Sequence, residues 1–376
     1  MTVAAPWFER EEFIARVRCV QTAMRARGLD AVLAFQPESV TWLTGFFTRG
    51  YSTFQFALVP ASGDPAILCR DVAQYYLDRT CVFRDTQTWA DGTDRNAAAA
   101  DFLRQRLGGS ARIGVELGAW QLNAARWEAL KAALVGFGLE DCGDLIQRMR
   151  YVKSPAEIAY QRRAAAAAEA GMNAGRAAAR VGVRERDVAA EISAAMMRAG
   201  SDVPGPGPLS SGERARHLHG GFSDRVLEHG DTLQVECTPA VRYYHARFMR
   251  TIKIGAADDE DRRRAKTLIA IQDAALREVR PGGRAAIPDR IYREGIISAG
   301  YAKSYTNKTF YSIGLMLPPT GGEALEATPD CAWVFEPGMV FHTYLLADSF
   351  GFSETIAVTN EGFERLTHYP RELFVA

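Results

Sequence analysis

The segment RYVKSPAEIAYQRRAAAAAEAGMNAGRAAARV (residues 150–181) separates two different patterns along this chain. Within it, Ser154 is followed by Pro155 and then by Glu157, the arrangement that begins a helix, because serine caps the first turn and glutamate completes a capping box. Alanine is the strongest helix former, and its small side chain allows close packing against a sheet. The segment therefore predicts a long helix after Ser154 and a domain boundary just before Tyr151.

Residues 1–150 alternate between strand-like and helix-like patterns. Apolar residues recur at helical spacing from Glu11 to Gly28, and short apolar runs bounded by turn residues follow. The strand-like runs are residues 31–35, 54–60, 65–69 and 111–117, and the later helix-like runs are residues 97–107 and 123–134. Strands that alternate with helices predict an α/β domain over residues 1–150.

Residues 151–376 combine helices with longer strand-like segments. The helix-like segments are residues 155–181, 184–199, 258–279 and 286–299, and the strand-like ones are residues 232–239, 244–254, 340–346 and 354–359. The run VPGPGPLSSGE (residues 203–213) predicts a loop, because Pro, Gly and Ser interrupt regular structure. These elements predict an α+β domain in which helices pack on a curved, mainly antiparallel sheet.

Composition limits the classes of partner. Lys plus Arg and Asp plus Glu are balanced at 45 each, so nothing favours nucleic acid or an anionic membrane, and a small polar ligand is the more natural partner. The six cysteines are scattered without a CxxC pair, which argues against disulfides and a zinc–thiolate site. The chain contains no run of about 18 apolar residues, the length that a membrane span needs. Near the N-terminus, acidic residues precede any apolar run, which is not the pattern of a signal peptide. We therefore expect a cytoplasmic protein.

Six phrases in a fixed order carry a family resemblance over the whole chain. They are TWLTGF (residues 41–46), RYVKSPAEIA (150–159), SDRVLEHGD (223–231), RTI (250–252), EPGMVF (336–341) and TIAVTNEGFERLT (355–367). Together they resemble the creatinase/prolidase family. The resemblance implies a pita-bread catalytic domain over residues 151–376, an α/β domain over residues 1–150, and a homodimer. It also implies that the loop beginning at Phe47 reaches into the partner's site.

The positions where metal-dependent members of that family bind two divalent ions have changed. The resemblance implies two Asp, one His and two Glu at these positions, and this chain has Glu236, Arg247, Tyr311, Tyr344 and Ser353 there, with Glu354 adjacent to the last. Hard divalent cations need several oxygen or imidazole ligands, and an adjacent guanidinium repels them. We therefore expect no metal and no other cofactor.

Metal-independent members of the family, creatinase and ectoine hydrolase, resemble this chain more closely. The stretch YSIGLMLPP (residues 311–319), the following Gly322-Glu323 and Ser353-Glu354-Thr355 are similar to ectoine hydrolase. Creatinase has its proton-transfer histidine eleven residues before the glycine of the Gly-Asp turn, a position that His219 occupies here. A neutral imidazole suits acid–base work near pH 7. His217 remains an alternative, and for either histidine a simple hydrogen-bonding role in a loop stays open.

These residues together suggest chemistry on a planar cation. Carboxylates at Glu236 and Glu354 would pair with an amidinium or guanidinium, water or Glu236 itself would attack its carbon, and His219 would protonate the departing nitrogen. The expected substrate-binding residues are His217, Arg247, Tyr311, Tyr344, His342 and Phe47. The alternatives are a structural Arg247–Glu236 ion pair, tyrosines that only pack, and a Glu354 that pairs with a lysine.

The resulting expectation is a metal-independent hydrolase of a C–N bond in a small cyclic amidine, guanidine or amide. Three alternatives stay open. One is a related enzyme of cyclisation, dehydration or C–N lysis, because hydrolysis and ring closure share a transition state. The others are a metal-dependent Xaa-Pro peptidase, which the altered ligand positions disfavour, and a binding protein without activity. The identity of the substrate does not follow from the sequence.

Overall fold

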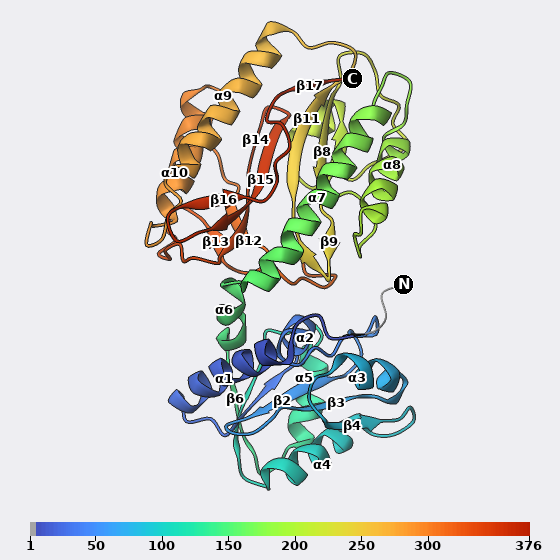
Figure 1. The fold of residues 1–376 in the computed structure, drawn as a ribbon, viewed down its shortest axis with the longest axis vertical. Coiled ribbons are helices and arrows are strands. Elements are labelled where there is room, and N and C mark those ends of the chain that lie inside the picture. Colours follow the sequence, from blue (N-terminus) through green and yellow to red (C-terminus); the bar gives the residue numbers. More distant parts are fainter. Residues whose placement is uncertain (1–4) are drawn as a thin grey trace. The chain divides into compact units, whose positions relative to one another are not determined.

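The structure is a computed structural model that describes residues 5–376 (Figure 1). The chain folds as two compact units that divide between Arg150 and Tyr151. Each unit has its own strands and its own hydrophobic core. Among the described residues, no helix is long and apolar enough to cross a membrane.

The N-terminal unit is built on one six-stranded sheet with the order β4-β3-β2-β1-β5-β6. The strands are β1 (Ala31–Ala34), β2 (Phe56–Pro60), β3 (Ala66–Arg70), β4 (Asp85–Trp89), β5 (Arg112–Val115) and β6 (Gly138–Asp141). The helices are α1 (Arg10–Ala26), α2 (Pro37–Thr44), α3 (Gln74–Thr80), α4 (Arg95–Leu107), α5 (Ala124–Ala133) and α6 (Leu145–Tyr151). Because β1 pairs antiparallel with β2 and parallel with β5, the sheet is mixed, and the α/β expectation is confirmed.

The C-terminal unit contains two larger sheets with a pair of helices packed on each (Figure 1). The four-stranded sheet has the order β17-β11-β8-β7 and the five-stranded sheet the order β13-β12-β14-β15-β16. Their strands are β7 (Leu209–Ser211), β8 (Thr232–Cys237), β11 (Phe248–Lys253), β12 (Phe310–Ser312), β13 (Glu326–Ala327), β14 (Val340–Ala347), β15 (Phe350–Val358), β16 (Phe363–Arg365) and β17 (Phe374–Val375). The short strands β9 (Ala240–Val241) and β10 (Tyr244–His245) form a separate ribbon. The expected α+β, pita-bread architecture is confirmed.

The helices of this unit are α7 (Pro155–Ala178), α8 (Glu185–Arg198), α9 (Asp259–Leu276) and α10 (Ala286–Ser298). The capping box expected at the start of α7 is present: the Ser154 hydroxyl accepts from the Glu157 N–H at 3.2 Å, and the Glu157 carboxylate accepts from the Ser154 N–H at 2.9 Å. Small residues let α7 approach α8 closely, since a Cβ on Gly171 would lie 2.5 Å from the Met196 Cγ. The long helix is therefore fixed at its start and along its length.

A buried ion pair joins the two sheets. Arg250 on β11 donates to the Glu354 carboxylate on β15 at 2.8 Å, and both side chains are fully buried. Beside them, the Thr251 hydroxyl accepts from the Gly351 N–H at 2.9 Å. These contacts hold β11 next to β15, so residues from both sheets can meet in one site.

Two expected elements differ from the structure. The run 203–213 was expected to be a loop, but Leu209–Ser211 forms β7 and pairs with β8, because backbone partners there outweigh weak local propensity. The single strand expected over residues 244–254 is divided into β10 and β11. The two parts have different partners, because β10 pairs with β9 in the short ribbon whereas β11 pairs with β8.

Candidate active site

One face of the five-stranded sheet gathers the polar side chains of the candidate site. Tyr311 on β12 lies opposite His342 on β14, and His342 lies opposite Thr355 on β15. Two residues further along β14, Tyr344 lies opposite Ser353. Side chains alternate between the faces of a sheet and cross-strand partners share a face, so all five side chains point to the same side.

His342 is a buried imidazole with both ring nitrogens engaged. Its Nδ1 lies 2.8 Å from the Tyr311 hydroxyl and its Nε2 lies 2.7 Å from the Ser353 hydroxyl. The ring stacks on Tyr344 with centroids 5.3 Å apart. Burial, with a smaller contribution from Arg247, lowers the pKa of His342 well below its usual value. The imidazole is therefore neutral at pH 7, with one nitrogen donating and the other accepting.

Glu236 brings a carboxyl group from the other sheet. It lies on β8 opposite Met249 of β11, and it is only 5% exposed. Its Oε1 is 3.9 Å from the His342 Nε2 and has no hydrogen-bond partner in the part of the chain that the structure describes. Burial raises the pKa of Glu236 to about 7, against the opposing effect of Arg247. A carboxyl group with this pKa exchanges a proton in the neutral range.

Arg247 is held in place by backbone and side-chain contacts. Its N–H donates to the Thr355 hydroxyl at 2.7 Å, and the same hydroxyl donates back to the Arg247 carbonyl at 2.8 Å. Its guanidinium donates to the Tyr311 hydroxyl at 3.0 Å, while its Nε is buried without a partner in the described chain. Glu236 and Arg247 thus present one open acceptor and one open donor to the same region of the unit.

The two candidate histidines of the loop stand outside this cluster. His217 and His219 are both exposed, and His219 has a φ of 66°. Leu218 between them is partly buried against an apolar cluster that includes Tyr311 and Tyr344. The loop therefore packs through Leu218 on a cluster to which two site tyrosines belong, while the imidazole that lies beside Glu236 in the structure is that of His342.

Glu354 lies on the opposite face of the sheet from the other candidates. It pairs across β14 with Thr343, one residue out of step with His342 and Tyr344, so its side chain points away from theirs. Its carboxylate accepts from Arg250 at 2.8 Å and from the Thr367 hydroxyl. Its partner is therefore Arg250 and not the lysine considered from the sequence. These contacts give Glu354 a structural role.

Phe47 belongs to the N-terminal unit. Its ring centroid lies 4.9 Å from that of Trp7 and 6.4 Å from that of Tyr51, and its N–H donates to the Thr80 hydroxyl at 3.0 Å. These contacts lie within the N-terminal unit, and the role of Phe47 in substrate binding stays a proposal.

The donor set does not fit a divalent metal. At the five positions of the family's ligands, Glu236 is the single carboxylate, and the others are a guanidinium, two phenols and a serine hydroxyl. Among residues 5–376, no three His, Cys, Asp or Glu side chains are grouped to hold an ion. Divalent ions of this kind require several anionic oxygen or imidazole ligands together.

Sequence reasoning missed two contacts that shape the site. Ser353 hydrogen-bonds His342, and Thr355 holds the backbone of Arg247. Lys308 was also missed, and its Nζ lies 5.2 Å from the centroid of the Tyr311 ring. The alternation of residues 353 and 355 on a strand was the available signal, but the pairing of that strand with its neighbour was needed to use it.

Comparison with known proteins places the chain in a family. Residues 159–360 match metallopeptidase family M24, and residues 16–152 match the creatinase/prolidase N-terminal domain. The chain therefore belongs to metallopeptidase family M24, with the two-domain organisation of its creatinase and prolidase members.

Several relatives extend over nearly the whole chain. An uncharacterized hydrolase/peptidase, y4tM, of Sinorhizobium fredii is 30% identical over 98% of both chains. An ectoine hydrolase of Halomonas elongata is 27% identical over 98% of both chains. The crystal structure of the dipeptidase PepE of Mycobacterium ulcerans superimposes with a TM-score of 0.83 at 24% identity, covering 98% of this chain and 99% of the other. That structure, at this identity, supports the fold.

Proposed function

We propose that this protein hydrolyses a C–N bond in a small cyclic amidine, guanidine or amide without a metal ion. The observation that carries the proposal is the buried Glu236 carboxyl group, whose Oε1 has no hydrogen-bond partner in the described chain and whose pKa burial raises to about 7. It occupies a family ligand position that lacks companion ligands. The similarity to an ectoine hydrolase supports the same reading.

The open polar atoms indicate a substrate with both signs of charge. An ionised Glu236 would pair with the planar cation of an amidinium, and the open Nε of Arg247 would donate to a carboxylate on the same molecule. Tyr311 keeps the guanidinium oriented by its 3.0 Å hydrogen bond. A small cyclic amidine that carries a carboxylate satisfies both groups.

The reaction uses one water molecule and two proton transfers. Glu236 accepts a proton from water while the oxygen of that water bonds to the electrophilic amidine carbon. When the resulting tetrahedral species collapses, the C–N bond breaks and the departing nitrogen takes a proton. His219, or His217 beside it, supplies that proton from the loop, because both imidazoles are exposed to solvent and can be reprotonated. For a cyclic amidine, the hydroxyl group of the collapsing species gives up its proton to become the carbonyl, and the product is one ring-opened molecule that carries an amide and an amine.

A substrate panel tests this proposal. Purified protein should turn over at least one cyclic amidine, guanidine or cyclic amide with a mass gain of one water, and EDTA should leave the rate unchanged. Glu191→Gln changes an exposed residue of α8, so it serves as the control and should turn over the same substrate at the wild-type rate. Activity that EDTA abolishes and Mn²⁺ or Zn²⁺ restores, or activity on Xaa-Pro dipeptides alone, would overturn the proposal.

We further propose a homodimer in which Phe47 of one subunit serves the site of the other, as the family resemblance implies. Phe47→Ala and Glu236→Gln inactivate different parts of such a shared site. Mixing the two inactive variants should then restore about a quarter of the activity, since random exchange leaves one site intact in half of the dimers. A monomer in light scattering, or no recovery on mixing, would contradict this arrangement.

A further inference from the structure

Glu185, at the start of α8, is a buried carboxylate outside the candidate site. Its side chain is fully buried, although it lies in the first turn of a helix beside exposed charged residues. It accepts hydrogen bonds from Ser211 at the end of β7, from Ser223 just before Arg225, and from Arg214 between them. Between Ser211 and Ser223 runs the segment 212–222, named here the histidine loop because it carries His217 and His219.

The Glu185 carboxylate fastens both ends of the histidine loop. One oxygen accepts from the Ser211 N–H at 2.8 Å and from the Ser211 hydroxyl at 2.6 Å. The other accepts from the Ser223 N–H at 2.8 Å and from the Ser223 hydroxyl at 2.7 Å. Arg214, inside the loop, donates to the second oxygen as well. Five donors therefore converge on one carboxylate.

The charge of Glu185 is part of this arrangement. Burial would raise the pKa of Glu185, but the hydrogen bonds from Ser211, Arg214 and Ser223 outweigh burial and leave the pKa below its usual value. A glutamine has the same shape, but its NH2 group would meet N–H and O–H donors where an oxygen now accepts. The loop ends therefore depend on an ionised carboxylate.

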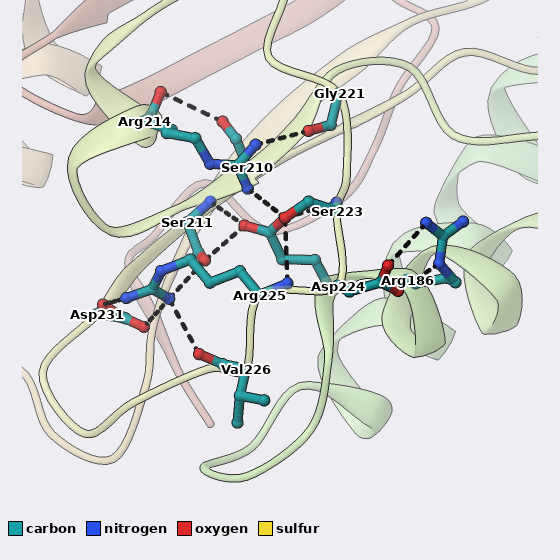
Figure 2. Close-up of polar contacts among 11 residues, drawn as sticks. Arg186, Ser210, Ser211, Arg214, Gly221, Ser223, Asp224, Arg225, Val226 and Asp231 are labelled. Atoms are coloured by element: carbon teal, nitrogen blue, oxygen red, sulfur yellow. Dashed lines mark hydrogen bonds and ion pairs between the residues drawn. The ribbon is translucent and has the colours of Figure 1, made fainter.

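Further contacts make the loop a compact unit. Arg214 donates to the Gly221 carbonyl at 3.0 Å, and the Leu209 N–H donates to the Gly220 carbonyl at 2.9 Å. Arg225 donates to the Ser211 hydroxyl at 2.9 Å and also pairs with Asp231 (Figure 2). With its ends and its base fixed, the loop presents a defined tip.

The tip of the loop is attached to an apolar cluster that includes residues of the candidate site. Leu218 packs on the apolar cluster that contains Tyr311 and Tyr344, and His217 and His219 flank it. We propose that Glu185 is a positioning residue that holds the histidine loop in register with the site, so that a loop imidazole can deliver a proton to the leaving nitrogen. This inference rests on the proposed function for its catalytic meaning, whereas the hold on the loop is independent of it.

Glu185→Gln and Ser223→Ala test the inference, with Asp187→Asn as a matched control. Asp187 lies in the same turn of α8, but its partner Arg184, at 3.0 Å, is exposed. Hydrogen exchange of residues 212–222 and steady-state kinetics should be measured for each folded variant. In Glu185→Gln we expect exchange in the loop to rise at least tenfold and kcat to fall about 10- to 100-fold with KM nearly unchanged, because misplacement of about 1 Å costs rate. Asp187→Asn should match the wild type.

The outcomes separate this inference from the proposed function. Ser223→Ala removes one of the five donors to Glu185, together with the hydrogen bonds that its hydroxyl accepts from Arg214 and from the Arg225 N–H. The Glu185 carboxylate and the Ser223 N–H remain, so this variant should fold and show a smaller change of the same kind even if Glu185→Gln does not fold. Unchanged loop exchange in the folded variants would overturn the inference, as would faster exchange with unchanged kcat. A wild-type protein without hydrolytic activity, whose Glu185 variants still lose protection, would overturn the proposed function and with it the catalytic meaning of the loop.

Discussion

The Oε1 of Glu236 lies 3.9 Å from the Nε2 of His342, and the two side chains come from different sheets of the same unit. The contact is not an ion pair at pH 7, because burial lowers the pKa of His342 well below its usual value. The same burial raises the pKa of Glu236 to about 7. A neutral imidazole thus faces a carboxyl group that ionises near neutral pH.

Replacing Glu236 by Gln should abolish most of the activity. The amide can neither accept a proton from water nor pair as an anion with a cationic substrate, and general base catalysis contributes about 10²- to 10⁴-fold. We expect kcat to fall by about that factor, measured on the substrate that the panel identifies. The exposed Glu191→Gln change should leave kcat as in the wild type, and a Glu236→Gln protein of wild-type activity would exclude Glu236 as the base.

The pH profile should report Glu236 directly. The ionised form is the active one, so kcat/KM should rise with pH through about 7, the value to which burial raises its pKa. The measurement is kcat/KM between pH 5 and 9 in the presence of EDTA. A profile that is flat across pH 6 to 8, or that falls with rising pH, would contradict this role.

Glu236→Gln should stabilise the protein at high pH. A folded-state pKa above the unfolded value means that the folded protein holds a proton that the unfolded chain has lost, so stability falls as pH rises from about 4.5 to about 7. This pKa shift lowers the unfolding free energy above pH 7 by on the order of 3 kcal/mol. We therefore expect urea unfolding to show the variant more stable than the wild type at pH 8 and similar at pH 4.5. A variant less stable at both pH values would show that burial does not strain this carboxyl group.

Glu354→Gln should affect stability more than chemistry. Arg250 would keep its buried charge and lose its ionised partner, a loss that costs ~3–5 kcal/mol in buried pairs. Urea unfolding should show this cost, while kcat of the remaining folded protein stays within about threefold of the wild type. A large fall in kcat without loss of stability would return Glu354 to the catalytic set.

Tyr311→Phe should weaken binding of substrates that carry a carboxylate. The hydroxyl accepts from Arg247 at 3.0 Å and lies 2.8 Å from the His342 Nδ1, so its loss frees the guanidinium from its present orientation. We expect KM to rise about tenfold for a substrate with a carboxylate, the scale of one hydrogen bond to a charged group. Tyr292→Phe, whose hydroxyl bonds Thr343 on the other face, is the control. Equal KM changes in both variants would argue against this role.

Most of the fold could be predicted from the sequence, because the patterns that indicate it lie in short continuous segments. The capping residues Ser154 and Glu157, the helix that follows and the position of Glu236 after the Gly-Asp turn could all be read along the chain. β7 could not, since a run rich in Pro, Gly and Ser forms a strand there through its pairing with β8.

The arrangement of the site required information from distant segments. Glu354 was expected beside Glu236, but the pairing of β15 with β14 turns it to the other face. Glu185 contacts Ser211 and Ser223, which lie 26 and 38 positions further along the chain, so no local motif could predict these contacts. A single sequence gives the identity of a side chain, whereas strand pairing and loop closure decide which face or site it serves.

The strand that carries Ser353 and Glu354 also restricts how such a site can evolve. An acid at position 354 cannot take the place of a ligand at position 353, since neighbouring residues on β15 point to opposite sides of the sheet. Glu354 instead pairs with Arg250 and holds the two sheets together. A metal site on the other face would need acids at several alternate positions, which no single substitution supplies.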